Sequence, residues 1–374
     1  MRSTKWVSVI AAAALTFGVA ACGSDDNNDS GSSTAAATQS GTSAKKIALL
    51  LPESKTARYE SQDRPNFEKK LKELCSNCSI IYSNADQDAA KQQQQAEAAL
   101  TQGADVLVLD PVDGASAGAI VTRAKQANVP VISYDRLILN TPDLDYYISF
   151  DNEKVGVLQG TALVDKLKKD GKTSGSLVMI NGAPTDNNAK LFKQGAHSVI
   201  DDSGFKVAKE FDTPDWSPDK AQSEMEQAIT ALGKNGFVGV YAANDGTAGG
   251  AIAAMKSNGV DPKKIPTTGQ DAELAGIQRI VAGTQYMTVY KAIKAEAEAA
   301  ATLANDLAQG KTPDASTVNG KTDNGKAQVP SVLLTPVAVN IDNINDTIIK
   351  DGFWKASEIC TSQFAAACKT AGIQ

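Results

Sequence analysis

The sequence lacks any dense run of basic residues. Its 374 residues include 37 Lys and Arg against 43 Asp and Glu, a formal net charge of -6. Neutralising a phosphate backbone takes a clustered basic surface, so this distribution argues against a nucleic-acid-binding protein. Hydrophobic residues make up 42% of the chain, which at this length is enough for two domains with separate cores.

Motifs for nucleotide binding and hydrolysis are also scarce. No Gly-x-x-x-x-Gly-Lys-Ser/Thr loop is present, so the chain itself is not expected to bind a nucleotide. Gly114–Gly118 matches the Gly-x-Ser-x-Gly pattern of a hydrolase, but the single histidine, His197, belongs to a helical stretch in the second half of the chain. Small residues at a helix start explain the match, and we expect no enzymatic activity, no cofactor and no metal.

The N-terminus has the pattern of an export signal. Arg2 and Lys5 precede an apolar run from Val7 to Ala21 that is too short to span a bilayer comfortably, which predicts a signal peptide over residues 1–21. The run ends before Cys22 in small residues that resemble a bacterial lipobox. Cys22 would then be the lipid attachment site, with acyl chains that anchor the protein. Ordinary cleavage with an incidental Cys22 is the alternative.

The segment that follows, residues 22–44, is predicted to be a disordered tether. From Gly23 to Ala44 it has no apolar residue larger than alanine, so it cannot join a core. A flexible chain of this length has an r.m.s. reach of roughly 25 Å. We therefore expect an exported protein that is anchored as a lipoprotein to the outer face of the cell membrane, or is periplasmic.

Four further cysteines can pair outside the cytoplasm. Cys75, Cys78, Cys360 and Cys368 allow three pairings, and proximity favours Cys75 with Cys78 and Cys360 with Cys368. Cys75 and Cys78 could form a redox pair instead. They follow a helical stretch, however, whereas reactive pairs usually open a helix that lowers the thiol pKa. Both pairs are therefore interpreted as structural disulfides.

From Lys46 onward, apolar strand-like runs alternate with amphipathic helical patterns. Such alternation is typical of parallel sheets covered on both faces. In the first series the predicted strands are Ile47–Leu51, Ser79–Tyr82, Asp105–Leu109, Pro130–Ser133 and Tyr147–Ser149, and in the second they are Ser176–Ile180, Phe205–Ala208, Phe237–Val240, Ile265–Gly269 and Tyr286–Val289.

Two similar α/β units in tandem follow from this pattern. A long helix over Ala292–Ala308, a loop over Gly310–Gln328 and a strand over Val332–Leu334 complete the chain. We expect two Rossmann-like lobes: residues 45–150 with 291–330, and residues 151–290 with 331–374. The chain would cross between them near Phe150–Asn152, Tyr290–Ala292 and Pro330–Thr335.

Polar or aromatic side chains follow nearly every predicted strand. Ligands of such sheets bind beyond the carboxyl ends of the strands, where a cleft between two lobes would lie. The candidate ligand residues at these ends are Arg58, Tyr59, Asp135, Arg136, Asn187, Asn188, Trp216, Asn244, Asp271 and Lys291. Carboxylates, amides and cations suit adjacent sugar hydroxyls, an indole face covers the apolar side of a pyranose, and the opposite charges favour a neutral ligand.

Each of these residues also has a purely structural explanation. Asp135 could cap a turn, Asp271 or the Asn187–Asn188 pair could cap helices, and Trp216 could pack between lobes. A polar residue after nearly every strand of both units is better explained by one shared site.

Several long segments resemble the xylose-binding family of periplasmic binding proteins. They include Ser133–Arg136, Asp145–Gly156, Pro184–Phe192, Asn244–Ile252, Gly269–Gly276, Ala282–Lys291, Leu333–Pro336 and Asp346–Phe353. The resemblance extends over Lys46–Glu358. It implies a type I periplasmic-binding fold with a hinge, a sugar between the lobes, and the ligand contacts named above.

The resemblance also implies partners. A monomeric, non-catalytic protein would capture a monosaccharide, D-xylose in first place, and deliver it to an ABC-type permease driven by a separate cytoplasmic ATPase. Tyr59 stands where the family usually has a second tryptophan, which leaves glucose, galactose or arabinose as alternative sugars. A receptor for a membrane sensor is a further alternative, whereas a related transcription factor would need an N-terminal DNA-binding unit.

Overall fold

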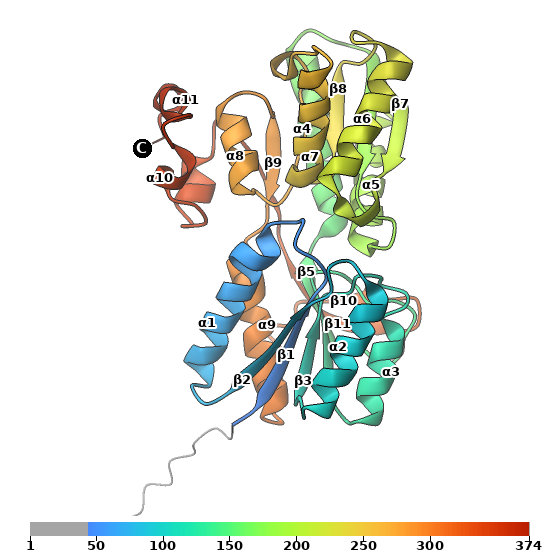
Figure 1. The fold of residues 1–374 in the computed structure, drawn as a ribbon, viewed down its shortest axis with the longest axis vertical. Helices are drawn as coiled ribbons and strands as arrows, with labels where there is room; N and C mark the ends of the chain where they lie inside the picture. Colours follow the sequence, from blue (N-terminus) through green and yellow to red (C-terminus); the bar gives the residue numbers. More distant parts are fainter. Residues whose placement is uncertain (1–43, 374) are drawn as a thin grey trace, which may run out of the picture. The chain divides into compact units, whose positions relative to one another are not determined.

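The computed structural model describes residues 44–373, and the predicted signal peptide, Cys22 and most of the tether lie outside these residues. Two groups of α/β elements follow one another along the chain, each with its own sheet (Figure 1). No helix among residues 44–373 combines the length and apolar character needed to cross a membrane.

The first sheet has seven strands in the order β10-β11-β5-β4-β3-β1-β2. All neighbours pair in parallel except β10 with β11. The strands are β1 (Lys46–Leu51), β2 (Ser79–Asn84), β3 (Val106–Leu109), β4 (Val131–Tyr134), β5 (Tyr146–Phe150), β10 (Gly320–Asp323) and β11 (Gln328–Leu334).

Helices cover both faces of this sheet, as the continuous apolar strands predict. The helices are a π-helical turn η1 (Tyr59–Asp63), α1 (Arg64–Leu74), α2 (Ala89–Thr101), α3 (Gly118–Gln126) and α9 (Ile293–Ala308). Ile47, Leu49 and Leu51 of β1 pack with α1 and α9 on one face. The intervening Ala48 and Leu50 point to the opposite face, against α2 and α3.

Strand β11 continues the first sheet beyond the predicted lobe boundary at residue 330. Its residues Ser331–Leu334 pair with Tyr147–Phe150 of β5. The chain therefore leaves this sheet only after Leu334.

The second sheet is smaller than the sequence predicts. It has three parallel strands, β7-β6-β8, formed by β6 (Gly175–Asn181), β7 (Phe205–Asp212) and β8 (Gly239–Ala242). The predicted strand Ile265–Gly269 makes only an isolated parallel bridge, Val240 to Thr267. The N–H of Val240 donates to Pro266 and the N–H of Thr268 donates to Val240, but the next N–H of β8, that of Ala242, donates to the Thr268 hydroxyl instead of to a backbone carbonyl.

The fifth predicted strand of this unit forms a separate pair. Strand β9 (Met287–Tyr290) pairs antiparallel with β12 (Val337–Asn340), a strand that the pattern does not predict. The helices of this half are α4 (Asn152–Lys169), α5 (Asn187–Ile200), a 3-10 turn η2 (Pro214–Trp216), α6 (Pro218–Leu232), α7 (Asp245–Ser257), a 3-10 turn η3 (Pro262–Lys264) and α8 (Leu274–Val281).

The last residues fold into a small helical segment that the sequence pattern also does not predict. It comprises a π-helical turn η4 (Asn345–Ile349), α10 (Ala356–Ile359) and α11 (Ala365–Ala371), which lie beside α8 (Figure 1). Phe353, Ile359 and Cys368 share one buried cluster with Ile277 of α8.

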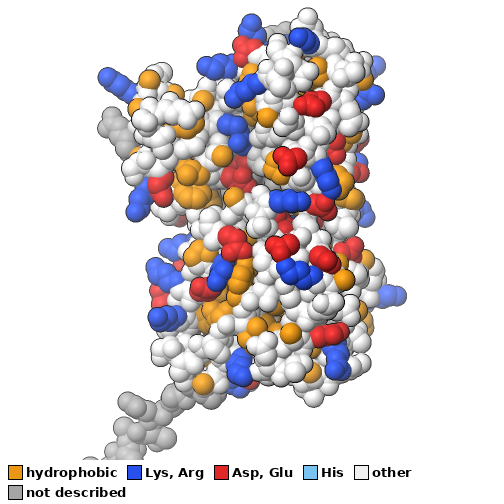
Figure 2. All heavy atoms as spheres, viewed as in Figure 1, with side chains coloured by type: hydrophobic (Ala, Val, Ile, Leu, Met, Phe, Trp, Pro, Cys, Tyr) orange, Lys and Arg blue, Asp and Glu red, His pale blue; other side chains and the backbone are white. Residues whose placement is uncertain are grey.

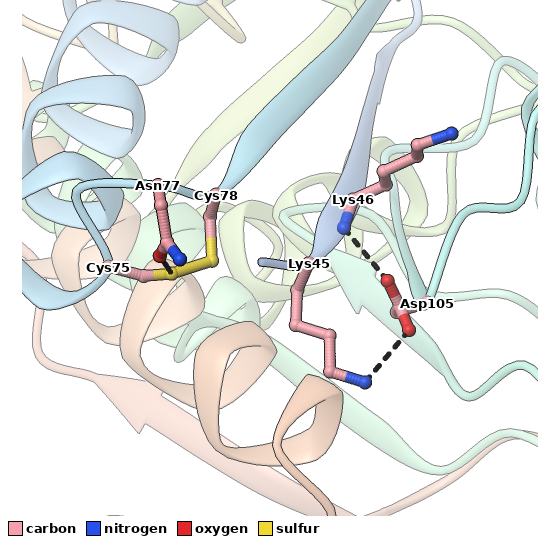
Figure 3. The surroundings of a disulfide bond; sticks show 6 residues. All are labelled: Lys45, Lys46, Cys75, Asn77, Cys78 and Asp105. Carbon is pink, nitrogen blue, oxygen red and sulfur yellow. Dashed lines mark hydrogen bonds and ion pairs between the residues drawn. A yellow bond between two sulfur atoms is a disulfide. The ribbon is translucent and has the colours of Figure 1, made fainter. Parts of the chain in front are cut away.

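Two disulfides join the cysteines in the expected pairs. Cys75 bonds Cys78 between the end of α1 and the start of β2, and Cys360 bonds Cys368 between α10 and α11. Figure 3 shows the first bond near the start of β1, where Lys45 and the backbone N–H of Lys46 both contact the Asp105 carboxylate. The first pair therefore lies at the amino end of β1, and the second lies in the C-terminal segment.

Candidate functional site

A cavity lies where the carboxyl ends of strands from both sheets come together. Its atom-free volume is about 250 Å³. The residues that line it are Thr56, Arg58, Tyr59, Asp135, Arg136, Asp186, Asn188, Phe192, Trp216, Asn244, Gln270, Asp271 and Lys291. Nine of the ten predicted ligand residues are among them.

Asn187 is the predicted residue that does not line the cavity. It is the first residue of α5 and is half-buried. The helix is capped by Asp186, whose carboxylate accepts a hydrogen bond of 2.8 Å from the backbone N–H of Asn188. Asn188, one position further along the helix, is the member of the pair that reaches the cavity.

Two carboxylates, those of Asp63 and Glu296, bind the guanidinium of Arg58. Its Nε and Nη2 donate to Asp63 at 2.9 and 2.6 Å, and Nη2 also donates to Glu296 of α9 at 2.9 Å. Burial alone would lower the pKa of the guanidinium, but Asp135, Asp63 and Glu296 raise the pKa well above its usual value. The remaining Nη1 has no hydrogen-bond partner among the described residues and lies 3.6 Å from Asp135 and 3.5 Å from Asp271.

Asp135 is fixed in a left-handed backbone conformation, with φ of 54°. One carboxylate oxygen accepts a hydrogen bond of 2.8 Å from the Tyr59 hydroxyl, and its backbone carbonyl accepts one of 3.0 Å from the Asn188 amide. Burial would raise the pKa of Asp135, but the charges of Arg58, Lys291 and Arg136 outweigh burial and lower the pKa to about 2. Asp135 is therefore an ionised acceptor at neutral pH.

Arg136 connects the first half to Asp186 and Trp216 of the second. Its Nε lies 3.1 Å from an oxygen of Asp186, and the same oxygen accepts a hydrogen bond of 3.1 Å from the indole N–H of Trp216. The Trp216 ring packs over Gly182, where an added Cβ would lie 2.0 Å from the ring. Glycine at this position thus lets the indole lie flat against the strand end.

Asp271 and Lys291 form an ion pair beyond the end of β9. The Lys291 ammonium lies 2.9 Å from Asp271 Oδ1, and the amide of Gln270 donates to Oδ2 at 3.1 Å. Asp271 has φ of 88° and the next residue, Ala272, has φ of 50°. The alternative explanation of Asp271 as a helix cap is not observed, since α8 begins at Leu274 after Glu273.

Asn244 both caps a helix and lines the cavity. Its side chain accepts a hydrogen bond of 2.8 Å from the backbone N–H of Thr247 and so caps α7. It also lines the cavity. Capping and exposure to the cavity are therefore compatible in one residue.

Four lining residues were missed by the sequence prediction: Thr56, Asp186, Phe192 and Gln270. Asp186 and Gln270 each lie one or two positions from a predicted residue, so the rule about strand ends did reach their segments. Phe192 lies inside α5, where an apolar residue on a helix face looks like any other core residue.

The cavity combines balanced charge with aromatic walls. Three cations, Arg58, Arg136 and Lys291, oppose three carboxylates, Asp135, Asp186 and Asp271. Phe192 and Trp216 meet edge to face at 6.3 Å, and the guanidinium of Arg58 lies 5.2 Å from the Tyr59 ring centre. Such a site suits a small neutral ligand with several hydroxyls and one apolar face.

The hydrolase pattern in the sequence has no matching geometry. Ser116 takes part in a turn closed by its backbone N–H and the Asp113 carboxylate. His197 contacts Asp201 and Glu210 at 3.0 and 3.1 Å on the outer part of α5 and β7. Neither Ser116 nor His197 lines the cavity.

The outer surface has mixed charge around these elements. Figure 2 shows basic and acidic side chains interspersed on the face that it draws. This pattern agrees with the sequence-based argument against a phosphate-backbone ligand.

Comparison with known proteins gives three related results. A periplasmic binding protein domain family matches residues 47–312. The D-xylose-binding periplasmic protein of Escherichia coli (strain K12) is 43% identical over 84% of this chain and 92% of its own length. The multiple sugar-binding periplasmic receptor ChvE of Rhizobium radiobacter is 36% identical over 84% of this chain and 92% of its own length.

A solved structure supports the same grouping. The carbohydrate transporter solute binding protein from Chloroflexus aurantiacus, in complex with D-glucose, superposes with a TM-score of 0.75 at 30% identity. The match covers 84% of this chain and 98% of that protein. The two-sheet arrangement therefore belongs to one known architecture.

Proposed function

Because the chain belongs to the periplasmic binding protein family, we propose that it captures a monosaccharide, D-xylose in first place, and delivers it to an ABC-type membrane permease. The observation that carries this proposal is the cavity in which three cations and three carboxylates surround aromatic rings. Net charge near zero disfavours a phosphate or dicarboxylate, whereas paired donors and acceptors suit sugar hydroxyls.

In this proposal each lining residue has a defined role. Asp135 and Asp271 accept hydrogen bonds from sugar hydroxyls, and Trp216 covers the apolar face of the sugar ring. The donors to hydroxyls or the ring oxygen are Arg58, Arg136, Asn188, Asn244 and Lys291. The sequence analysis proposed both Asn187 and Asn188 as sugar contacts, and we now propose Asn188 alone, since only Asn188 of this pair lines the cavity.

D-Xylose is favoured by the similarity to a D-xylose-binding protein at 43% identity. Glucose is the second candidate, because two solved relatives at 28% and 30% identity hold glucose.

Binding would close two lobes around the sugar. We place the first lobe at residues 45–150 with 291–334 and the second at 151–290 with 335–374, since β11 remains in the first sheet to Leu334. Backbone rotation near Asp151, Lys291 and Leu334 would allow the closure. The chain has no role in chemical conversion in this proposal.

Export and anchoring complete the proposal. Cys22 would carry the lipid, and residues 22–44 would tether the protein near its permease on the outer face of the cell membrane. Both cysteine pairs would be oxidised in that environment. Mass spectrometry of the membrane fraction tests this, with Cys22→Ser expected to release the protein into the medium or periplasm.

Calorimetric titration of residues 45–374 with xylose, glucose, galactose, ribose and arabinose tests the ligand. Thermal unfolding serves as the second measurement, since a ligand at a hundredfold excess over Kd stabilises the folded state by about 2.7 kcal/mol. Binding of xylose with the highest affinity supports the proposal. Highest affinity for a hexose would replace D-xylose by that hexose as the proposed ligand. If the folded, ligand-free protein binds none of these sugars, the proposal of sugar capture is overturned.

A further inference from the structure

The turn that presents Asp271 has an unfavourable backbone conformation. Asp271 and Ala272 both have positive φ, 88° and 50°, although neither is glycine. Such conformations are unfavourable for residues other than glycine and persist only where the surroundings hold them. What holds this turn therefore decides where the Asp271 carboxylate points.

On its inner side the turn is held by the second half itself. Asp245 accepts a hydrogen bond of 2.9 Å from the backbone N–H of Glu273, and the N–H of Asp271 donates to Val289 at 2.9 Å. The Thr288 hydroxyl accepts from the N–H of Ala272 at 3.2 Å. These contacts leave the carbonyl of Ala272 for a partner from elsewhere.

That partner comes from the C-terminal segment, defined here as Phe353–Ile373. The indole N–H of Trp354 donates to the Ala272 carbonyl at 2.8 Å. Ala272 is fully buried and shares a hydrophobic cluster with Phe353, Ile359 and Cys368 of this segment. The residue next to Asp271 is thus fixed by a residue about 80 positions later in the chain.

The same segment also contacts the residue next to Lys291. Phe353 stacks edge to face on Tyr290 at 5.1 Å and on Trp354 at 5.5 Å. A continuous row of rings therefore runs from Trp354 to the end of β9, directly before Lys291. Ala272, the residue after Asp271, and Tyr290, the residue before Lys291, therefore both pack on the C-terminal segment.

A second cavity shows how closely this segment approaches the site. Its atom-free volume is about 690 Å³, and Arg58 and Asp271 line it together with Leu274, Phe353 and Trp354. Only the Arg58–Asp271 pair is shared with the first cavity. Trp354 and Phe353 thus face the same space as the side chains at the edge of the candidate sugar site.

The Cys360–Cys368 disulfide closes the segment behind these rings. Cys368 is buried in the same cluster as Phe353 and Ala272. Gln278 of α8 donates to the carbonyl of Glu358 at 3.1 Å, just before the first cysteine. The disulfide adds a covalent link between α10 and α11 to the apolar contacts that this segment makes with α8.

We infer that the C-terminal segment fixes the turn carrying Asp271 and the strand end carrying Lys291, with Trp354 as a positioning residue, so that the Cys360–Cys368 disulfide sets sugar affinity. This inference rests on the proposed sugar-binding function. Trp354 would not touch the sugar and would act through Ala272.

The test measures sugar Kd for Trp354→Phe and for the double variant Cys360→Ser/Cys368→Ser. Phenylalanine keeps an aromatic ring and removes the N–H donor, and loss of one buried hydrogen bond corresponds to about a threefold to tenfold change in Kd. The matched control is Cys75→Ser/Cys78→Ser, which removes a disulfide at the amino end of β1, outside the cavity lining (Figure 3).

Affinity should fall in the first two variants and stay unchanged in the control, at a temperature where all are fully folded. Hydrogen exchange of the peptide containing residues 270–273 should rise in the same two variants only. Combining Trp354→Phe with the disulfide variant should weaken binding by less than the product of the single effects, because both act on one turn.

Unchanged Kd in Trp354→Phe, or equal loss in both disulfide variants, would overturn the inference. If Cys360→Ser/Cys368→Ser fails to fold, the sugar Kd and the hydrogen exchange of Trp354→Phe alone test the inference. Failure of the wild-type protein to bind any sugar would instead reject the proposed function, so the two failures are distinguishable.

Discussion

The Lys291 ammonium lies 2.9 Å from the Asp271 carboxylate, and both side chains are almost fully buried. Asp271 stands on a turn, whereas Lys291 directly follows strand β9. The pair neutralises both charges in the cavity and leaves Asp271 within 3.5 Å of Arg58 from the other half. Three charged groups from three segments therefore meet at one point of the site.

Replacing Asp271 with asparagine should abolish most sugar binding. Asparagine tolerates positive φ and keeps the shape of the side chain, but it removes an ionised acceptor and the nearer of the two carboxylates that Lys291 contacts. A hydrogen bond to a charged group contributes about 1.5–3 kcal/mol, so Kd should rise at least about tenfold.

Calorimetry with the preferred sugar measures this loss, and Asp165→Asn on the exposed face of α4 is the matched control. Ligand-free thermal stability should change little. A large loss of stability with unchanged affinity would assign Asp271 a structural role.

Trp216→Phe should weaken sugar binding more than it weakens the fold. The change reduces the ring that faces the cavity and removes the N–H that donates to Asp186. Loss of part of a stacking contact and a hydrogen bond predicts an affinity about tenfold lower.

Phe237→Leu provides the comparison for Trp216, because Phe237 is buried in a different cluster. It should cost stability and leave Kd unchanged. Equal affinity losses in both variants would show that the Trp216 effect is only loss of packing.

Tyr59→Phe should lower affinity by removing the hydroxyl that holds Asp135. That hydroxyl donates to Asp135 at 2.8 Å, and its loss should release the carboxylate from one fixed orientation. We expect Kd to rise about fivefold. Tyr241→Phe is the control, because the buried Tyr241 hydroxyl has no hydrogen-bond partner among the described residues. A tighter complex in Tyr59→Phe would contradict this role.

Stability should fall as pH rises between about 4 and 7 through Asp245. Burial raises the pKa of Asp245 from 3.8 to about 7, although Arg279 and the hydrogen bond from Gln285 oppose the rise. The folded state thus keeps a proton that the unfolded chain releases, so deprotonation opposes folding across this window. One such group contributes a slope of at most about 1.4 kcal/mol per pH unit.

Urea unfolding of the ligand-free protein at several pH values measures this slope. Asp245→Asn should reduce the dependence between pH 4 and 7, with the buried Glu273, whose pKa burial raises to about 8, contributing a slope of the same sign, and Asp165→Asn should leave it as in the wild type. An unchanged slope in Asp245→Asn would assign the pH dependence to other groups.

The sequence predicted the strand-end residues because a parallel sheet places all its carboxyl ends at one edge. Asp135, Asn244 and Asp271 were found by this rule without knowledge of the ligand. The rule could not predict which residue of a helix start turns inward, and so Asn187 was included alongside Asn188. It also gave no signal for Phe192, whose contact with the cavity depends on how α5 is rotated.

Long-range contacts were beyond the sequence pattern. The bridge from Trp354 to Ala272 joins segments about 80 residues apart, and nothing in the local pattern around Trp354 indicates a partner. The predicted strand Ile265–Gly269 is likewise reduced to an isolated bridge, because the N–H of Ala242 donates to the Thr268 hydroxyl and not to a backbone carbonyl.

Three lining residues, Asp135, Trp216 and Asp271, have φ of 54°, 52° and 88°. Isoleucine, valine and threonine are poorly accommodated at such backbone angles, so substituting any of them at these positions would strain the backbone. A library meant to change the preferred sugar should therefore vary Thr56, Tyr59 and Phe192, which line the same cavity without positive φ. The backbone thus divides the wall of the cavity into positions where side chains of many shapes fit the fold and positions where few do.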